Sequence, residues 1–205
     1  MNVSPRSALA EQLQQVPAAE AYDRLLRAPR GRRRVFRWLE ARAVARALAH
    51  AHGESVLDCP CGTGRLDPLL RARFGRVVGV DCSPAVLEIY RREHPERCAE
   101  QADAFALPFA DAAFDWVVSH RLFHHLRSDE KRLALLRSLA RVAREGIIVY
   151  AWLDAPLDPR GRVRHKAISR AHAERLLAEA GLALEAVHYA AWPFQPKAEL
   201  VARKR

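Results

Sequence analysis

The fold of this chain depends on seven residues that join an expected strand to an expected helix: Asp58-Cys59-Pro60-Cys61-Gly62-Thr63-Gly64. They follow the short apolar run 55–58 and precede a stretch with helical character that continues to about Phe74. In open α/β sheets, ligands bind where the parallel strands end. Two glycines at such a point let backbone amides approach a ligand closely, and a helix N-terminus attracts negative charge. We therefore expect a ligand-binding turn over residues 58–64.

Runs rich in β-branched and aromatic residues alternate with helical stretches along the rest of the chain. We expect strands at these ranges: 55–58, 76–81, 98–102, 114–119, 146–150, 182–189 and 199–202. Ser83-Pro84, Ser128 and Ser169 are typical helix starts, and Gly181 is a typical helix end. Alternating strands and helices predict a mostly parallel, seven-stranded sheet that is covered on both faces, an α/β fold.

The first part of the chain differs from this pattern. Residues 1–52 lack strand signals, and apolar residues recur at helical spacing over 35–48. We expect a helical N-terminal cap or lid over residues 1–52 and the ligand-binding domain over 53–205.

The positive charge is concentrated in this cap. The chain has a net charge of +10, and the window from Arg24 to Arg46 holds nine arginines and one acid, Glu40, which accounts for +8. Three interpretations remain open: a solvated helix face, a surface for an anionic substrate or membrane headgroups, and a contact with nucleic acid. No apolar run approaches the length of about 20 residues that a membrane-spanning helix needs, and we expect a cytoplasmic protein without a membrane span.

The spacing of the glycines separates two classes of cofactor. In a dinucleotide-binding turn, the third glycine would stand where this chain has Asp67, and a carboxylate there faces a pyrophosphate unfavourably. The other class is a cationic sulfonium with an amino-acid end. For that class, Asp58 at the end of its strand can attract the ammonium group, and Asp81 at the end of the next strand can accept hydrogen bonds from both ribose hydroxyls.

At this point the chain resembles the class I S-adenosylmethionine-dependent methyltransferases. Residues 58–65 resemble the first motif of the family, with Pro60 where the first glycine commonly lies. Residues 80–84 resemble the ribose-binding motif, and residues 102–109 with 111 and 114–115 are similar to the third block of the ubiquinone-biosynthesis-like branch. The resemblance covers roughly residues 54–205.

The resemblance implies a Rossmann-like three-layer sandwich whose last strand, Lys197–Lys204, is antiparallel. It implies that Asp103 hydrogen-bonds the adenine amino group, that Ala104 offers its backbone amide, and that Ser119 and His120 lie beside the methionine moiety. The expected residues of the S-adenosylmethionine site are Asp58, Pro60, Cys61, Gly62, Thr63, Gly64, Asp81, Cys82, Asp103, Ala104, Ser119 and His120. We assign the thiols of this region to packing around the cofactor and expect no metal.

Two further histidines follow the expected strand 114–119. His124 and His125 are candidates for a general base, because an imidazole titrates near neutral pH. The alternatives are that they pack or face solvent, since methyl transfer from a sulfonium often needs only the alignment of donor and acceptor.

We therefore predict an S-adenosylmethionine-dependent methyltransferase that acts on a small molecule, with an anionic acceptor compatible with the arginine window. The first alternative is a sensor or partner subunit that binds S-adenosylmethionine without transferring its methyl group. The second is an RNA methyltransferase. The residues after the expected strand 114–119, Ser119-His120-Arg121-Leu122, differ from the Asn/Asp-Pro-Pro-aromatic run of enzymes that methylate base amino groups, which argues against nucleic acid.

Overall fold

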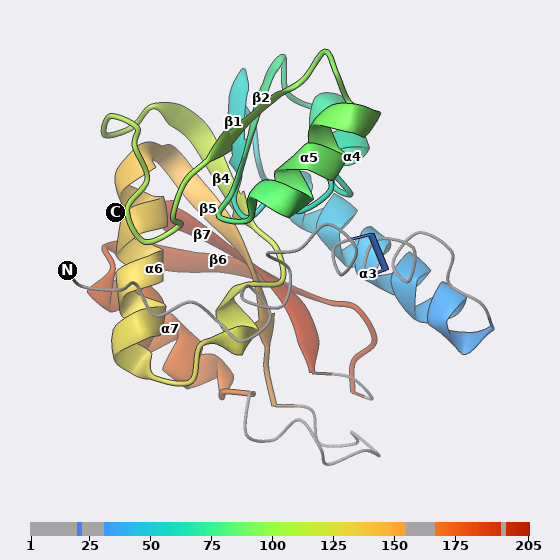
Figure 1. The fold of residues 1–205 in the computed structure, drawn as a ribbon. Helices are drawn as coiled ribbons and strands as arrows, with labels where there is room; N and C mark the ends of the chain where they lie inside the picture. Colours follow the sequence, from blue (N-terminus) through green and yellow to red (C-terminus); the bar gives the residue numbers. More distant parts are fainter. Residues whose placement is uncertain (1–19, 22–30, 155–166, 194–195) are drawn as a thin grey trace.

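A computed structural model describes residues 20–21, 31–154, 167–193 and 196–205 of the 205-residue chain. We use the element labels of Figure 1. The elements, in chain order, are α3 (Arg32–Leu48), β1 (Ser55–Asp58), α4 (Asp67–Arg71), β2 (Arg76–Asp81), α5 (Pro84–Glu93), β3 (Cys98–Gln101), β4 (Phe114–Ser119), the 3-10 helix η1 (Phe123–His125), α6 (Asp129–Val142), β5 (Ala143–Trp152), α7 (Arg170–Glu179), β6 (Leu182–Tyr189) and β7 (Lys197–Lys204).

The seven strands form one sheet in the order β3-β2-β1-β4-β5-β7-β6 (Figure 1). β7 is antiparallel to both of its neighbours, and the other neighbouring pairs are parallel. The predicted mostly parallel sheet with an antiparallel last strand is confirmed. Because β1 lies between β2 and β4, the three strand ends that carry Asp58, Asp81 and Ser119 lie next to one another.

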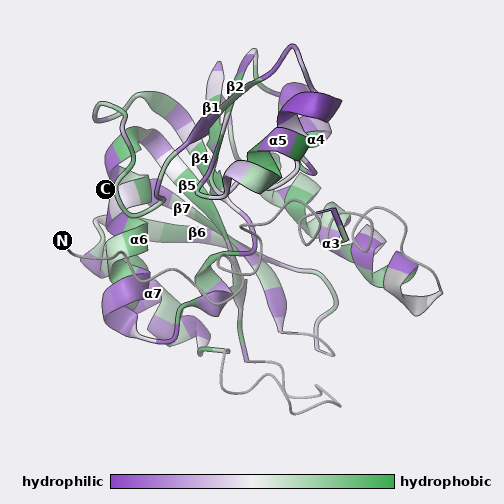
Figure 2. Cartoon of the chain, in the orientation of Figure 1, coloured by the Kyte–Doolittle hydropathy of each residue, from purple (hydrophilic) through white to green (hydrophobic). Residues whose placement is uncertain are grey.

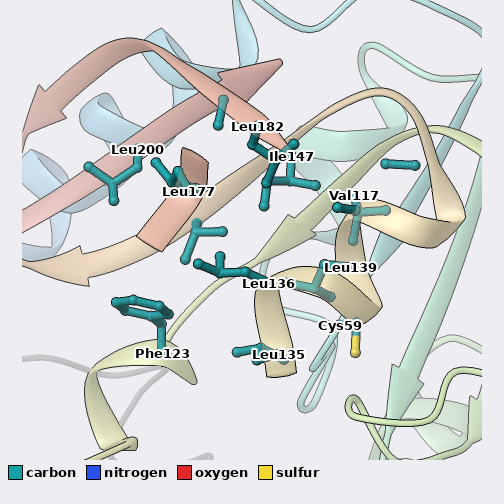
Figure 3. Packing of buried hydrophobic residues seen from close by; sticks show 14 of the residues in the cluster. Cys59, Val117, Phe123, Leu135, Leu136, Leu139, Ile147, Leu177, Leu182 and Leu200 are labelled. Atoms are coloured by element: carbon teal, nitrogen blue, oxygen red, sulfur yellow. The ribbon is translucent and has the colours of Figure 1, made fainter. Parts of the chain in front are cut away.

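Alternation along the central strands divides the core between the two faces of the sheet. Val56 and Trp116 face one way and belong to a cluster with residues of α3 and α4. Their chain neighbours Leu57 and Val117 face the other way and belong to a cluster with residues of α6 and α7. Figure 3 shows part of this second cluster, where Leu139 of α6 lies among the strand residues. The three-layer architecture follows from this division.

Serine side chains cap the predicted helix starts. The hydroxyl of Ser83 accepts a hydrogen bond from the backbone of Val86 at 3.3 Å, and Ser169 accepts one from His172 at 3.1 Å. Ser128 caps α6 in the same way. Gly181 follows α7 with φ +78°, a conformation that favours glycine. These side chains set the points at which α5, α6 and α7 begin, as predicted.

The helix after the glycine turn is shorter than predicted. It begins only at Asp67 and ends at Arg71, whereas the sequence indicated helix up to about Phe74. Residues 62–66 form turns, in which the amide of Gly64 donates to the carbonyl of Cys61 at 3.1 Å and the amide of Asp67 donates to the carbonyl of Gly64 at 3.2 Å. The first helical hydrogen bond runs from the amide of Leu70 to the carbonyl of Leu66. Strand β5 is longer than the predicted range 146–150, because its ladder with β7 continues to Trp152. Strand β7 has the bounds that the family resemblance implied, Lys197–Lys204, and extends beyond the range 199–202 that the residue pattern indicated.

The N-terminal helix α3 has two different parts. Its second half contributes Ala47 and Leu48 to the core beneath the sheet, and neither is more than 1% exposed. Its arginines at 34, 42 and 46 lie at the surface. Figure 2 shows hydrophobic colour along the central strands and polar stretches on α3. The rest of the predicted cap, residues 1–19 and 22–30, lies outside the described residues. Among the described residues, no helix has the length and apolarity that crossing a membrane requires.

Candidate cofactor and acceptor site

The turn after β1 is held against the neighbouring strands by its own backbone. The amide of Cys59 donates to the carbonyl of Val118 at 2.9 Å, and the amide of Cys61 donates to the carbonyl of Val80 at 2.8 Å. The turn therefore lies over the ends of β4 and β2. The predicted loop residues Pro60, Cys61, Gly62 and Thr63 are brought together at this edge.

Gly64 is required by the space around it. It has φ +84°, and a Cβ atom built there would lie 2.8 Å from the ring of His94 and 2.9 Å from the ring of Tyr90. Gly62 has φ +57° with open space around it, so only its backbone conformation favours glycine. The two glycines therefore have different roles: Gly64 permits close packing, and Gly62 turns the chain.

Asp58 is a buried carboxyl group at the end of β1. Its side chain is 3% exposed, and Oδ1 has no hydrogen-bond partner among the described residues. Burial raises the pKa of this carboxyl well above its usual range; the charges of Asp67 and Asp81 raise it further, and Arg65 opposes them. An unsatisfied buried carboxyl group is costly to retain unless a ligand supplies a partner. The group that suits it is a cation with N–H donors.

Asp81 ends the neighbouring strand and shapes the same turn. Its Oδ2 accepts from the amide of Gly62 at 3.1 Å, and its Oδ1 accepts from the amide of Ser83 at 2.9 Å. Burial raises the pKa of Asp81, and these backbone hydrogen bonds oppose the rise. The carboxylate thus connects the glycine turn to the start of α5, with Cys82 between them at the end of β2.

Asp103 and Ala104 follow β3 and reach the same edge of the sheet. The amide of Ala102 donates to the carbonyl of Asp81 at 3.2 Å, which joins this segment to the end of β2. Oδ1 of Asp103 accepts from the amide of Phe105 at 3.0 Å. Ala104 is buried, and its contact with a ligand stays a prediction.

The histidines after β4 differ in how deeply they are buried. His120 and His124 are each 5% exposed, whereas His125 is half-buried. The ring of His124 lies parallel to that of Trp152, with centroids 4.7 Å apart, and 4.0 Å from the ring of His125. The two candidate bases are therefore in contact with each other, on the side of β5.

Three charged residues of this region carry no signal in the local sequence. Glu40 of α3 and Glu199 of β7 are buried at 4% and 2% exposure, and the ammonium group of Lys197 pairs with Glu40 across 157 positions of the chain. Nδ1 of His120 lies 3.0 Å from Oε1 of Glu199. Their place in the site is not visible in the sequence, because only the packing of α3 and β7 brings them to the end of β4.

The residues present fit S-adenosylmethionine. Asp58 offers an unsatisfied carboxylate oxygen to an ammonium group, and the turn at Gly62 leaves open space above its backbone. Asp81 ends β2, the strand that pairs with β1, and its contact with a ribose stays a prediction. Within the described residues, no three histidine, cysteine or acidic side chains gather into an arrangement that could hold a metal ion.

Comparison with known proteins agrees with this geometry. Residues 56–146 match a family model described as a methyltransferase domain. The chain is 40% identical over 133 residues to a demethylmenaquinone methyltransferase of Thermus thermophilus, across 62% of this chain and 57% of that protein. It is 32% identical over 102 residues to a tRNA (carboxymethyluridine(34)-5-O)-methyltransferase of Xenopus tropicalis, across 49% of this chain and 16% of that protein.

Solved structures share the whole architecture. The magnesium protoporphyrin IX methyltransferase of Synechocystis PCC 6803 with bound SAH superposes with a TM-score of 0.76 at 18% identity, over 96% of this chain and 98% of that one. At that identity the likeness concerns the fold. The chain spans about half or less of the length of the curated relatives it matches first.

Fold, motifs and relatives define one class of protein. Residues 56–146 match a methyltransferase domain, and the chain is similar in sequence to demethylmenaquinone methyltransferases, whose class is that of the S-adenosylmethionine-dependent methyltransferases.

Proposed function

We propose that this protein transfers a methyl group from S-adenosylmethionine to a small, anionic acceptor. The observation that carries the proposal is the buried carboxyl of Asp58, unsatisfied among the described residues and placed beside the glycine turn and Asp81. Relatives named for demethylmenaquinone and magnesium protoporphyrin IX support a small acceptor, and the exposed arginines of α3 support a negative charge on it.

In this proposal the chain's residues hold the cofactor in three places. Asp58 binds the ammonium group, Asp81 the ribose hydroxyls, and Asp103 with the backbone of Ala104 the adenine. Ser119 and His120 lie beside the methionine end. When bound, the cofactor supplies a methyl group on a positively charged sulfur. The chain's part in the reaction is to align that methyl group with the acceptor and to exclude water.

Transfer of radiolabelled methyl groups from S-adenosylmethionine into small molecules of a cell extract tests this proposal. Labelled product that depends on the folded protein supports an enzyme. Tight cofactor binding with no labelled product in any extract would instead support a sensor or partner subunit.

Replacing Asp81 with alanine is expected to weaken the binding of S-adenosylmethionine and of its demethylated product by about tenfold or more. The variant loses charge-assisted hydrogen bonds to the ribose, each worth about 1.5–3 kcal/mol, and also the bonds that hold Gly62 and Ser83. Calorimetric titration measures the affinity, with the exposed Asp111→Ala as a control. An unchanged affinity in a folded Asp81→Ala protein would refute the ribose assignment.

The affinity for S-adenosylmethionine is expected to rise with pH as Asp58 loses its proton. Burial raises the pKa of Asp58, so the free protein keeps this proton to a higher pH than an exposed carboxyl group does, and the proton must leave before the carboxylate can pair with an ammonium group. Because Asp67, Asp81 and Arg65 surround this group, the variant Asp58→Asn is needed to isolate the contribution of Asp58 to the pH dependence of binding. Calorimetry from about pH 5 to about pH 8 should show proton release on binding to the wild type and a flatter pH profile for the variant. 5′-Methylthioadenosine, which lacks the amino-acid end, is the matched ligand; equal pH dependence for both ligands would contradict the assignment.

Methylation of RNA is a second candidate, favoured by the tRNA methyltransferase relative and by exposed arginines at 34, 42 and 46 of α3. Phosphate contacts lose affinity steeply with salt. Binding of a transfer RNA with a steep salt dependence, followed by its methylation, would favour this candidate over the small acceptor.

A further inference from the structure

A cavity of about 280 Å³ lies between α3 and the segment that follows Gly64. α3 forms one wall, residues 65–69 form another, and His120 at the end of β4 contributes to the lining. The volume is close to the lower end of the range of about 300–1,000 Å³ that is typical of small-molecule pockets. The cavity adjoins the glycine turn, so a molecule in it would lie next to the proposed cofactor site.

The charges around this cavity are mainly positive. Its lining residues include three arginines, Arg34, Arg37 and Arg65, and one acid, Glu40. The ammonium group of Lys197 pairs with Oε1 of Glu40, so the one acid is already compensated. Guanidinium groups bind carboxylates and phosphates in two-point geometry. The lining therefore suits an anion. The anion would lie at the more exposed side of the cavity, because Arg34 lies at the surface.

His120 is the lining residue on the buried side of the cavity, and its ring nitrogens are themselves buried. Both ring nitrogens of His120 lack a hydrogen-bond partner among the described residues. Nδ1 lies 3.0 Å from Glu199, but the two groups are not aligned as a hydrogen bond. Burial lowers the pKa of His120 well below its usual range, and the nearby charges of Arg65, Arg121, His124 and Lys197 lower it further. A neutral imidazole both donates and accepts, and a hydroxyl group matches it in either tautomer.

Apolar side chains line the cavity between these two ends. Trp38 and Val44 of α3 and Leu66 and Leu69 on the opposite wall give it hydrophobic surface. Such surface binds a flat or ring-shaped apolar body, and the indole of Trp38 can stack on an aromatic ring.

We propose that this cavity is the acceptor site and that the acceptor is a hydroxy acid with an apolar ring body. Its acidic group lies against Arg34, Arg37 and Arg65, and its hydroxyl group bonds to His120. The inference rests on the proposed function, because it takes the ligand of this cavity to be the methyl acceptor. His120 acts here as a hydrogen-bonding group that orients the acceptor at the border of the cofactor site.

Three naphthalene probes separate the parts of this proposal. 6-Hydroxy-2-naphthoate has both polar groups, 2-naphthoate has only the acid, and 2-naphthol has only the hydroxyl. Calorimetry on the full chain without cofactor should show that 6-hydroxy-2-naphthoate binds most tightly. In the double variant Arg34→Gln, Arg37→Gln, the affinity for both acids should fall by about tenfold or more, and the affinity for 2-naphthol should change by less than about twofold.

Two further variants complete the test. Arg46→Gln is the matched control, because Arg46 is an exposed arginine of the same helix that does not line the cavity. His120→Phe, which keeps a ring of similar size, should make the two acids bind equally. Melting temperatures of the variants show whether each is folded.

Titration of S-adenosylhomocysteine in the same proteins distinguishes failure of this inference from failure of the proposed function. If no protein binds it, the proposed function fails whatever the probes do. If the arginine variant loses S-adenosylhomocysteine as strongly as the acids, these arginines hold the cofactor's carboxylate and the acceptor site is refuted. Equal binding of the three probes to the wild type would refute the hydroxy-acid class.

Discussion

Turnover is expected to fall by about 10²–10⁴ when the histidine that accepts the acceptor's proton is replaced with alanine. If the acceptor must lose a proton during transfer, we propose that His124 or His125, on the 3-10 helix after β4, accepts it. An imidazole has an ordinary pKa of about 6.5, which suits a base that works at neutral pH. The affinity for S-adenosylmethionine should stay nearly unchanged, since neither ring is among the residues assigned to the cofactor.

The structure makes the two variants different. His124 is buried and parallel to the ring of Trp152, so His124→Ala also removes packing and should lower the melting temperature. His125 is half-buried, so His125→Ala should leave the stability close to that of the wild type. Rates are therefore compared at equal folded fraction across about pH 6–9. Full turnover of both single variants and the double variant over this range would show that alignment alone drives the reaction.

Replacing Asp115 with alanine is expected to lower the free energy of unfolding by about 3 kcal/mol or more. Its Oδ2 accepts hydrogen bonds at 2.9 Å from the amides of Glu54 and Ser55 and from the hydroxyl of Ser55, and its Oδ1 accepts one from Arg144. The carboxylate therefore fastens the start of β4 to the start of β1, the two strands whose other ends carry the site.

The stabilisation that Asp115 contributes should depend on pH in a definite direction. Burial alone would raise the pKa of Asp115, but the hydrogen bonds from Ser55 and Glu54 and the charge of Arg144 outweigh it and lower the pKa. A carboxyl group whose pKa is lowered by folding stabilises the folded protein at any pH above its pKa in the unfolded chain, about 3.9. That stabilisation is lost as the pH falls through the pKa of the group in the folded protein. The difference between wild type and Asp115→Asn in urea unfolding should therefore be largest near neutral pH and shrink in acid.

A surface acid is the control for this measurement. Asp111 is 79% exposed and pairs with Arg141 at 2.9 Å. Asp111→Ala should change the free energy of unfolding by about 0–1 kcal/mol, as exposed ion pairs usually do. Equal effects of the two substitutions would contradict the role given to Asp115.

The sequence alone determined the order of the elements and which edge of the sheet carries the predicted site residues. Strand β6 begins at Leu182 and ends at Tyr189 as predicted, because Gly181 stops the preceding helix and apolar β-forming residues follow it. Asp58 and Asp81 each end a strand and Gly62 lies in the turn after β1, so the sequence could predict that they share one edge, because parallel strands bring their carboxyl ends together.

The tertiary structure decided how that edge is completed. Glu40, Lys197 and Glu199 look like ordinary charges of a helix and an edge strand when the sequence is read locally, yet Glu40 and Glu199 are buried and all three lie close to His120. Their positions follow from packing α3 beneath β7, which joins residues about 160 positions apart in the chain. Local sequence patterns encode strands, turns and caps within a few residues, whereas the charge and shape of the acceptor cavity arise only when separate elements meet.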